Sequence, residues 1–466
     1  ICLLAGTGNS PLLLTDLTHF LMYKEIIDWI DIFLVPAYFF MFLLVLLYIK
    51  KKNPNNILIQ KYLVKGFIFK VFCAIFYAML INFYYGFGDS MTYFKDAIFI
   101  KHQISTGAEN LSVLFDDYKT VTEAHNILAG GGPQGLFVEK VALVLSYVSL
   151  SRFLVTTLFF AAIAYSGMFK MLQTFNDIMP GWHKRLALIV LFFPSLSVFG
   201  SGVLKDTLCM ASLGWLIYCS HQLFIKKRVR LRYVLILLLA ATIISVVKVY
   251  ILAAFIVPYV MYLLILLVKK IRSRFIRRIV MPFLLVIVSA IYIINAGAID
   301  EKLGYYAVDK LFKNIQEQST SYLTSEEAET GAVFDLGVLE PTISGFIKKM
   351  PAGIAATIFR PFIWEAKKFI IIFSALESLF LLLLTIFIFY KTGIRHFFGN
   401  ILNNPFTFLC ITYALLFAAL IGLSTYNFGT LARYRIPLIP FYAAGLLNIL
   451  YCYQQVIQQK LSQTVS

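Results

Sequence analysis

Long uninterrupted runs of apolar residues recur along this chain of 466 residues. We place them at about 32–49, 66–85, 153–169, 185–200, 207–224, 233–249, 251–268, 279–296, 369–390, 405–423 and 436–453. A helix needs about 20 apolar residues to cross the hydrocarbon core of a bilayer. With 60% hydrophobic and only 14% charged residues, the composition excludes a soluble globular enzyme and a disordered chain. The sequence therefore predicts an all-α integral membrane protein with about 11 transmembrane helices.

Basic residues are distributed unevenly between these segments. Clusters at 50–52, 226–232 and 269–278 follow the first, fifth and seventh segments, and Lys and Arg collect on the cytoplasmic side of membranes. Placing these clusters in the cytoplasm puts the N-terminus outside and the C-terminus inside, provided that the apolar stretch 137–150 lies in the interface without crossing. The excess of Lys and Arg on the cytoplasmic side then explains the net charge of +17. We therefore expect the lipid bilayer as a partner, and no nucleic acid.

Two long acidic regions fall on the outer side in this topology. They are 86–152 and 297–368, and we expect both to carry interfacial helices. The connections on the cytoplasmic side are short, and long loops in a compact protein are usually functional or disordered. We therefore predict one polytopic membrane domain over 1–466, with its working face on the extracytoplasmic side.

Five basic residues at the outer ends of predicted spans break the positive-inside pattern. They come from segments far apart in the sequence and are Lys205, Lys248, Arg360, Arg433 and Arg435. Charges at such positions need a partner. A phosphate or pyrophosphate at headgroup depth would serve several of them, since Arg presents a rigid fork to phosphate oxygens and Lys a compact charge. The alternative is that each side chain simply reaches out to lipid headgroups.

Two acidic residues open the first outer loop. Asp89 directly follows the apolar segment 66–85, and Asp96 comes seven residues later, on the same face if this region is helical. A carboxylate held at the membrane surface could take a proton from an acceptor hydroxyl, so we predict Asp89 and Asp96 as catalytic. Asp89 could instead bind a metal ion or cap the next helix. No His or Cys spacing indicates a metal site. The sequence does not decide whether the protein uses a cofactor, and a divalent metal is one option.

Other polar features interrupt the apolar pattern. The stretch 194–206 is rich in Pro, Gly and Ser, and broken helices at membrane depth are tolerated where they line a cavity or are buried in protein. The helix that follows would favour an anion at its start; alternatively, Lys205 and Asp206 merely cap a tight hairpin. Glu377 lies inside the segment 369–390, where an acid is either functional or paired with a Lys or Tyr of the bundle.

Three motifs together resemble one group of bacterial membrane proteins. The motifs are FGDSMTYF at 87–94, PSLSVFGSGVLKD at 194–206 and NFGTLARYRIPLIPF at 427–441. They are similar to motifs of GT-C-type glycosyltransferases and of the related polymerases of oligosaccharide repeat units in surface-polysaccharide assembly. The resemblance implies a multi-pass enzyme of the bacterial inner (plasma) membrane. It also implies that Asp89 lies near the acceptor, while Lys205 and Arg433 hold the phosphate of a polyprenyl-linked sugar donor.

Our leading expectation is thus a membrane glycosyltransferase. It would transfer a sugar or glycan from a polyprenyl-(pyro)phosphate donor to a glycan or lipid acceptor at the outer face. A repeat-unit polymerase would use the same phosphate site with a lipid-linked acceptor, and the sequence leaves this alternative open. A transporter or lipid flippase, which often shows inverted repeats and paired broken helices, and a structural subunit of a membrane complex are the alternatives from other classes.

Overall fold

The structure, a computed structural model, describes residues 27–107, 109–125, 132–269, 308–324, 333–337 and 339–465. Regular structure within these ranges is helical, apart from an isolated bridge between Val333 and Asn427. The predicted all-α class is therefore confirmed. The helices gather into two compact units. Unit 1 holds the described residues up to Ala162 together with Ser201–Lys205, and unit 2 holds Ile163–Gly200 and the described residues from Asp206 onward.

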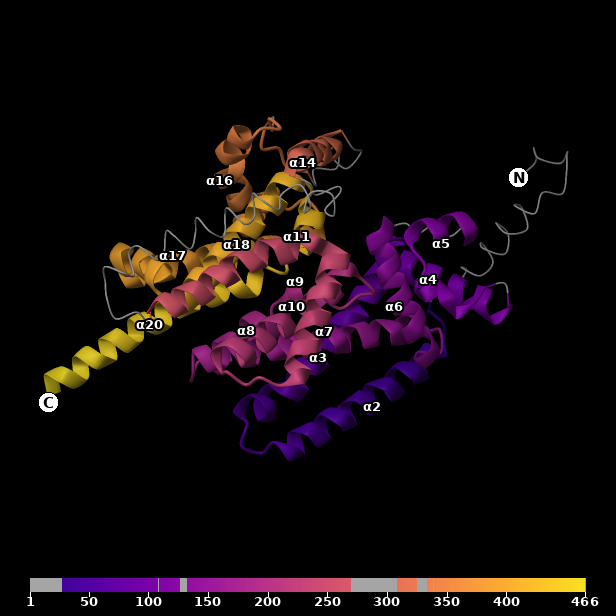
Figure 1. Cartoon of the computed structure of the whole chain (residues 1–466), viewed down its shortest axis with the longest axis horizontal. Helices are drawn as coiled ribbons and strands as arrows, with labels where there is room; N and C mark the ends of the chain where they lie inside the picture. The colour runs from indigo at the N-terminus through magenta and orange to yellow at the C-terminus, as the bar shows by residue number, and fades with distance from the viewer. Residues whose placement is uncertain are drawn as a thin grey trace. The chain divides into compact units, whose positions relative to one another are not determined.

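Unit 1 is built from the N-terminal helices, drawn from indigo to purple in Figure 1. In chain order they are α2 (Asp31–Lys52), η1 (Ile59–Leu63), α3 (Val64–Met79), η2 (Leu80–Tyr85), α4 (Asp89–Ser105), η3 (Leu111–Leu114), α5 (Tyr118–His125), α6 (Gly132–Val148) and the first part of α7 (Phe153–Ile178). Aromatic side chains join three of them: Phe42 of α2 packs edge-on against Phe67 of α3 and Phe159 of α7. Gly86, at φ 72°, ends η2 in a left-handed conformation that favours glycine, and the chain then turns into α4.

Unit 2 contains the remaining elements. They are the rest of α7, then α8 (His183–Leu191), α9 (Pro194–Phe199), α10 (Lys205–Ser220), η4 (His221–Ile225), α11 (Leu231–Lys269), α14 (Val308–Leu323), α16 (Ile343–Phe359), η6 (Ile363–Glu365), α17 (Phe369–Asn403), α18 (Pro405–Ser424), α19 (Phe428–Tyr434) and α20 (Ile439–Val465). Helix α18 is central, because it packs against α11, α16, α17 and α20.

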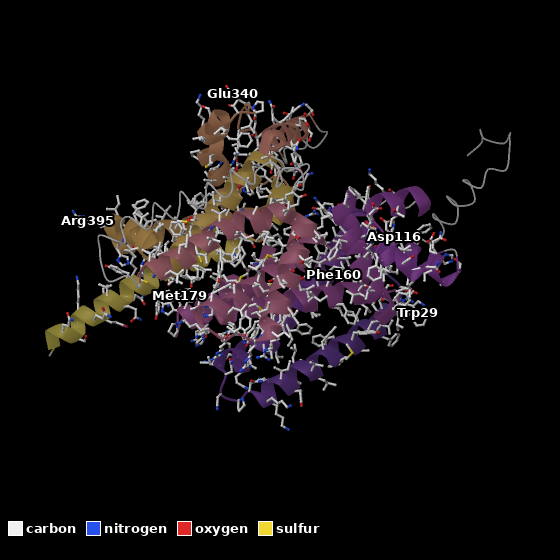
Figure 2. All side chains as sticks on the ribbon, viewed as in Figure 1. Trp29, Asp116, Phe160, Met179, Glu340 and Arg395 are labelled. Atoms are coloured by element: carbon white, nitrogen blue, oxygen red, sulfur yellow. The ribbon has the colours of Figure 1, made fainter. Side chains whose placement is uncertain are left out.

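Side-chain burial follows the apolar pattern within each unit (Figure 2). Phe160 lies in the interior of unit 1 and Met179 in that of unit 2, each with no exposed surface. Long apolar side chains such as Leu44, on the other hand, remain exposed along α2. Exposed apolar helices of this length suit contact with lipid tails.

Among the described residues, seven helices are long and apolar enough to cross a membrane, and an eighth is counted if the bent pair α19 and α20 forms one span. The seven are Asp31–Lys52, Ile59–Tyr85, Phe153–Ile178, Lys205–Ile225, Leu231–Lys269, Ile371–Asn403 and Pro405–Ser424. The chain is thus a multi-pass helical membrane protein. The expected count of about 11 spans is not confirmed over the described ranges, and the expected span 279–296 lies outside them.

Three predicted segments have different boundaries in the structure. The segment 185–200 is divided into α8 and α9, of nine and six residues, because Pro194 begins a new helix and cannot continue the preceding one. The segments 233–249 and 251–268 together form α11, whose backbone leaves helical geometry at Lys248 (φ −150°, ψ 77°). The basic residue that we placed at a span boundary therefore lies at a break within a 39-residue element.

Glycines allow close approach of helices in unit 2. A Cβ on Gly214 of α10 would lie 2.0 Å from the carbonyl oxygen of Gly167 in α7, and one on Gly422 of α18 would lie 2.1 Å from that of Gly353 in α16. Thr357 adds a hydrogen bond from its hydroxyl to the carbonyl of Ala418, at 2.9 Å. Small residues at helix contacts are typical of membrane bundles.

Candidate functional site

The most concentrated group of charges in unit 2 surrounds Asp206. This carboxylate lies in the first turn of α10 and is fully buried. Lys248, from the break in α11, places its Nζ 2.5 Å from Oδ1 of Asp206. Arg433, from α19, places its Nε 3.1 Å from Oδ2 of the same carboxylate. Two of the five predicted phosphate-binding residues therefore meet at one acid, although 185 positions separate them in the chain.

Local sequence determines how these side chains are presented. Asn427 caps α19 by accepting hydrogen bonds from the backbone N–H groups of Gly429 and Thr430, at 2.7 and 3.0 Å. Helix α19 then ends at Tyr434, and the chain bends by 65° into α20. The Tyr434 ring lies 4.1 Å from the Lys248 Nζ. An aromatic face at this distance stabilises a cation whose hydration has been removed by burial.

The three charged groups differ in their exposure. The side chains of Asp206 and Lys248 are 0% and 7% exposed, whereas that of Arg433 is 22% exposed. We call Asp206, Lys248 and Arg433 the Asp206 cluster. Arg433 is therefore the member of the cluster with the most accessible surface, and its guanidinium carries five N–H donors in a planar fork.

Arg435 has a different environment from Arg433. It is fully buried, and its guanidinium donates to the carbonyl of Arg360 at 3.0 Å, the hydroxyl of Ser378 at 2.7 Å and the carbonyl of Ser374 at 3.1 Å. It also forms an ion pair with Glu377 at 3.6 Å. The structure therefore gives Arg435 protein acceptors for its charge and places it in the packing around α17.

Glu377 is the intramembrane acid noted in the sequence, and it has a partner. Besides the ion pair with Arg435, its Oε1 accepts a hydrogen bond from the backbone N–H of Ser195 at 2.6 Å. Ser195 lies in the first turn of α9, where backbone N–H groups have no partner within the helix. Of the two alternatives, pairing within the bundle is the one observed, with Arg in place of the expected Lys or Tyr.

Arg360 also has its own carboxylate. It forms a fork-like ion pair with Glu365, and its guanidinium lies over the rings of Phe334 and Phe428, at 4.9 and 5.5 Å. The second oxygen of Glu365 accepts from the backbone N–H of Phe362 at 2.8 Å. Arg360 therefore joins η6 to the end of α16.

The remaining predicted residues lie in unit 1. Region 89–105 is helical, as the expected common face of Asp89 and Asp96 requires, but their exposure differs. Asp89 is exposed at the start of α4, directly after Gly88, whereas Asp96 is 6% exposed. Burial raises the pKa of Asp96 to about 7, with Lys95 acting in the opposite direction. Lys205 places its Nζ 5.7 Å from the centre of the Tyr93 ring on α4.

Sequence reasoning missed a further acid of unit 1, Glu139. It lies on α6 in the apolar stretch 137–150, is fully buried, and is close enough to Asp96 and Lys205 for both charges to affect it. Burial and the charge of Asp96 raise the pKa of Glu139 to about 8, while Lys205 and Lys140 oppose the rise. An acid within an apolar stretch was the signal that could have identified it.

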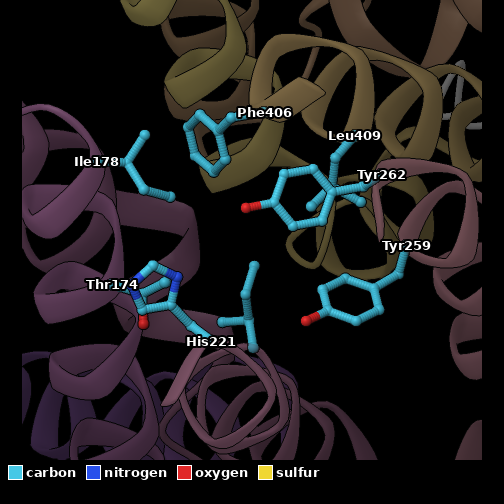
Figure 3. A pocket seen from close by; sticks show the side chains of 8 residues that line it. Thr174, Ile178, His221, Tyr259, Tyr262, Phe406 and Leu409 are labelled. Carbon is cyan, nitrogen blue, oxygen red and sulfur yellow. The ribbon is translucent and has the colours of Figure 1, made fainter. Parts of the chain in front are cut away.

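Unit 2 has a small pocket lined by apolar residues together with Thr174, His221, Tyr259 and Tyr262, and none of the predicted site residues lies in it (Figure 3). Within the described ranges, no group of three or more His, Cys, Asp or Glu side chains is placed to hold a metal ion. The question of a divalent metal thus gains no support from the geometry.

Comparison with known proteins gives no further guide. The chain matches no protein-family model, no curated protein and no solved structure.

Proposed function

We propose that this protein is a membrane glycosyltransferase that uses a polyprenyl-(pyro)phosphate donor. The proposal places the reaction at the extracytoplasmic face of a bacterial plasma membrane, with a glycan or lipid as acceptor. It is carried by the Asp206 cluster, in which Lys248 and Arg433 converge on one buried carboxylate.

The cluster has the charge and the geometry that a phosphate site needs. Asp206, Lys248 and Arg433 together carry one net positive charge, and the carboxylate holds the two cations in fixed positions. Electrostatic groups that are already oriented stabilise developing charge without a reorganisation cost. When a glycosyl bond breaks, negative charge develops on the leaving phosphate. The partly exposed guanidinium of Arg433 can donate hydrogen bonds to that phosphate.

The other predicted cations receive different roles in this proposal. Arg435 and Arg360 are engaged by Glu377 and Glu365, so we assign them to holding α16, α17 and η6 in place. On the acceptor side, a carboxylate of α4 removes the hydroxyl proton. Loss of such a base commonly lowers the rate by about 10²–10⁴.

One observation favours a second candidate, a transporter for an anionic lipid or solute. Both cations of the cluster come from interrupted helices: Lys248 from the break in α11 and Arg433 from the element that precedes the bend into α20. Helices broken around a charged site are common in secondary transporters. A transporter would bind the same phosphate but would form no glycosidic bond.

The first experiment measures binding of a polyprenyl phosphate to the purified protein in nanodiscs. We expect Arg433→Ala to weaken binding by at least tenfold, because it removes the accessible guanidinium. Arg395→Ala is the matched control, since Arg395 lies exposed on α17 and outside the cluster (Figure 2). Equal binding by wild type and Arg433→Ala would contradict the phosphate site.

The second experiment separates the two candidates. Cells that lack the chromosomal copy are complemented with each variant, and glycan is measured on the surface and on lipid carriers. A transferase defect leaves unreacted donor and acceptor, whereas a transport defect leaves completed glycan on the inner side. Normal surface glycan with Arg433→Ala would reject both candidates.

A further inference from the structure

Two buried carboxyl groups on the packed helices α4 and α6 of unit 1 have oxygens without a hydrogen-bond partner among the described residues. They are Asp96 of α4, through Oδ2, and Glu139 of α6, through both Oε atoms. Asp96 is 6% exposed and Glu139 0%. A buried carboxylate without partners is costly, and proteins usually avoid it by pairing or by protonation. Such a pair therefore needs an explanation in terms of function.

Helix packing brings the two acids together. Helices α4 and α6 lie against each other, and Gly135 of α6 makes a close approach. A Cβ added to Gly135 would lie 3.0 Å from the Tyr93 ring of α4 and 3.5 Å from Oε1 of Glu139. Because Gly135 has no side chain, space remains beside the Glu139 carboxyl group. The acid therefore lies in a narrow space between the two helices.

The charges around Asp96 and Glu139 favour one negative charge on the two acids over two. The charged groups that act on the pair are Lys95 on α4, Lys140 on α6, and Lys205 on the segment Ser201–Lys205, with the Tyr93 ring alongside. The negative charge of Asp96 raises the pKa of Glu139. Like charges at close range make protons leave such a pair in two separate steps.

We infer that Asp96 and Glu139 form a coupled carboxyl pair in which Glu139 keeps its proton and Asp96 takes the proton of the acceptor hydroxyl. This inference rests on the proposed function, and it selects Asp96 over the exposed Asp89 as the base. Glu139 is a positioning residue that limits the pair to one charge.

The proposed step conserves atoms and electron pairs. The hydroxyl oxygen of the acceptor forms a bond to the anomeric carbon with one of its electron pairs, and its proton passes to Asp96. The bond from the anomeric carbon to the donor phosphate oxygen breaks, and that electron pair stays on the phosphate. Asp96 later releases the proton to water. A base whose proton affinity lies near the working pH suits this transfer.

A spectroscopic titration tests the pair without relying on activity. Infrared difference spectra of the protein in nanodiscs follow the band of protonated carboxyl groups as pH rises. We expect a component that is present at neutral pH, disappears under alkaline conditions and is missing in Glu139→Gln. In Asp96→Asn the same component should disappear at a lower pH, because the charge that opposes ionisation of Glu139 has been removed. An unchanged titration in Asp96→Asn would overturn the coupling.

Formation of surface glycan tests the catalytic role. Asp96→Asn should lower the rate by about 10²–10⁴, whereas Glu139→Gln should abolish any change in rate that accompanies ionisation of Glu139 under alkaline conditions. The control is Asp117→Asn, an exposed acid of the same region whose cap to Thr120 an amide preserves. Full activity in Asp96→Asn, together with loss in Arg433→Ala, would refute this inference and leave the proposed function standing. Equal binding of polyprenyl phosphate by wild type and Arg433→Ala would instead overturn the proposed function.

Discussion

Replacing Asp206 should destabilise the protein more than replacing either of its cationic partners. Asp206→Asn leaves Lys248, which is buried, and Arg433 side by side without the carboxylate that separates their charges. Breaking a buried ion pair from one side typically costs about 3–5 kcal/mol, because the remaining charge is left without compensation. Lys248→Met should cost less, about 1–3 kcal/mol, since Asp206 keeps Arg433 at 3.1 Å.

A double-mutant cycle makes this ordering quantitative. In the variant with both Asp206→Asn and Lys248→Met, the unpaired buried amine is absent. The double variant should therefore be more stable than Asp206→Asn alone, with a coupling free energy of about 2 kcal/mol. The assay is unfolding of the purified protein in a mild detergent, with helix content as the signal. Additive effects of the two substitutions would refute the interpretation of the Asp206 cluster as one coupled unit.

Two further predictions concern helix contact and pH. Gly214→Ala should destabilise unit 2 by several kcal/mol, because its Cβ would overlap the Gly167 carbonyl. Gly399→Ala should stabilise α17 by up to about 1 kcal/mol, because its Cβ would meet nothing within 4 Å. Thermal unfolding of both variants checks this. The pKa of Glu139 is raised from 4.5 to about 8 in the folded protein, so the stability that its proton provides is lost as pH rises from about 4.5 to 8. Glu139→Gln should remove that loss and gain about 5 kcal/mol over wild type at pH 9, with no gain below pH 4. A parallel decline in both proteins would contradict the shift.

Apolar segments were predictable because their signal is local. The segments 32–49, 66–85 and 405–423 lie within helices of the structure with nearly the same bounds, since continuous runs of apolar residues leave few alternatives to a spanning helix. The break in α11 was less predictable. The sequence shows a Lys between two apolar runs, and this pattern fits a loop between two spans as well as a kink within one.

Partners of charged residues were harder to predict than the residues themselves. The convergence of Lys248 and Arg433 was expected, but their shared carboxylate, Asp206, was interpreted only as a helix cap. Glu139 is detectable from sequence as an acid within an apolar stretch, but its burial and its closeness to Asp96 depend on the packing of α4 against α6. A charged residue within an apolar segment can be recognised from sequence. The residue with which it pairs depends on contacts between segments that are far apart in the chain.

The two arginines of the RYR motif show why spacing alone could not assign their roles. Successive residues of an α-helix are turned by about 100°, so residues two positions apart point in nearly opposite directions. Arg433, inside α19, reaches Asp206, while Arg435, in the turn that follows, points into the packing around Glu377. One phosphate could not engage both arginines without unwinding this element. The motif therefore divides its charges between Arg433, which is partly exposed and pairs with Asp206, and Arg435, which is fully buried and pairs with Glu377.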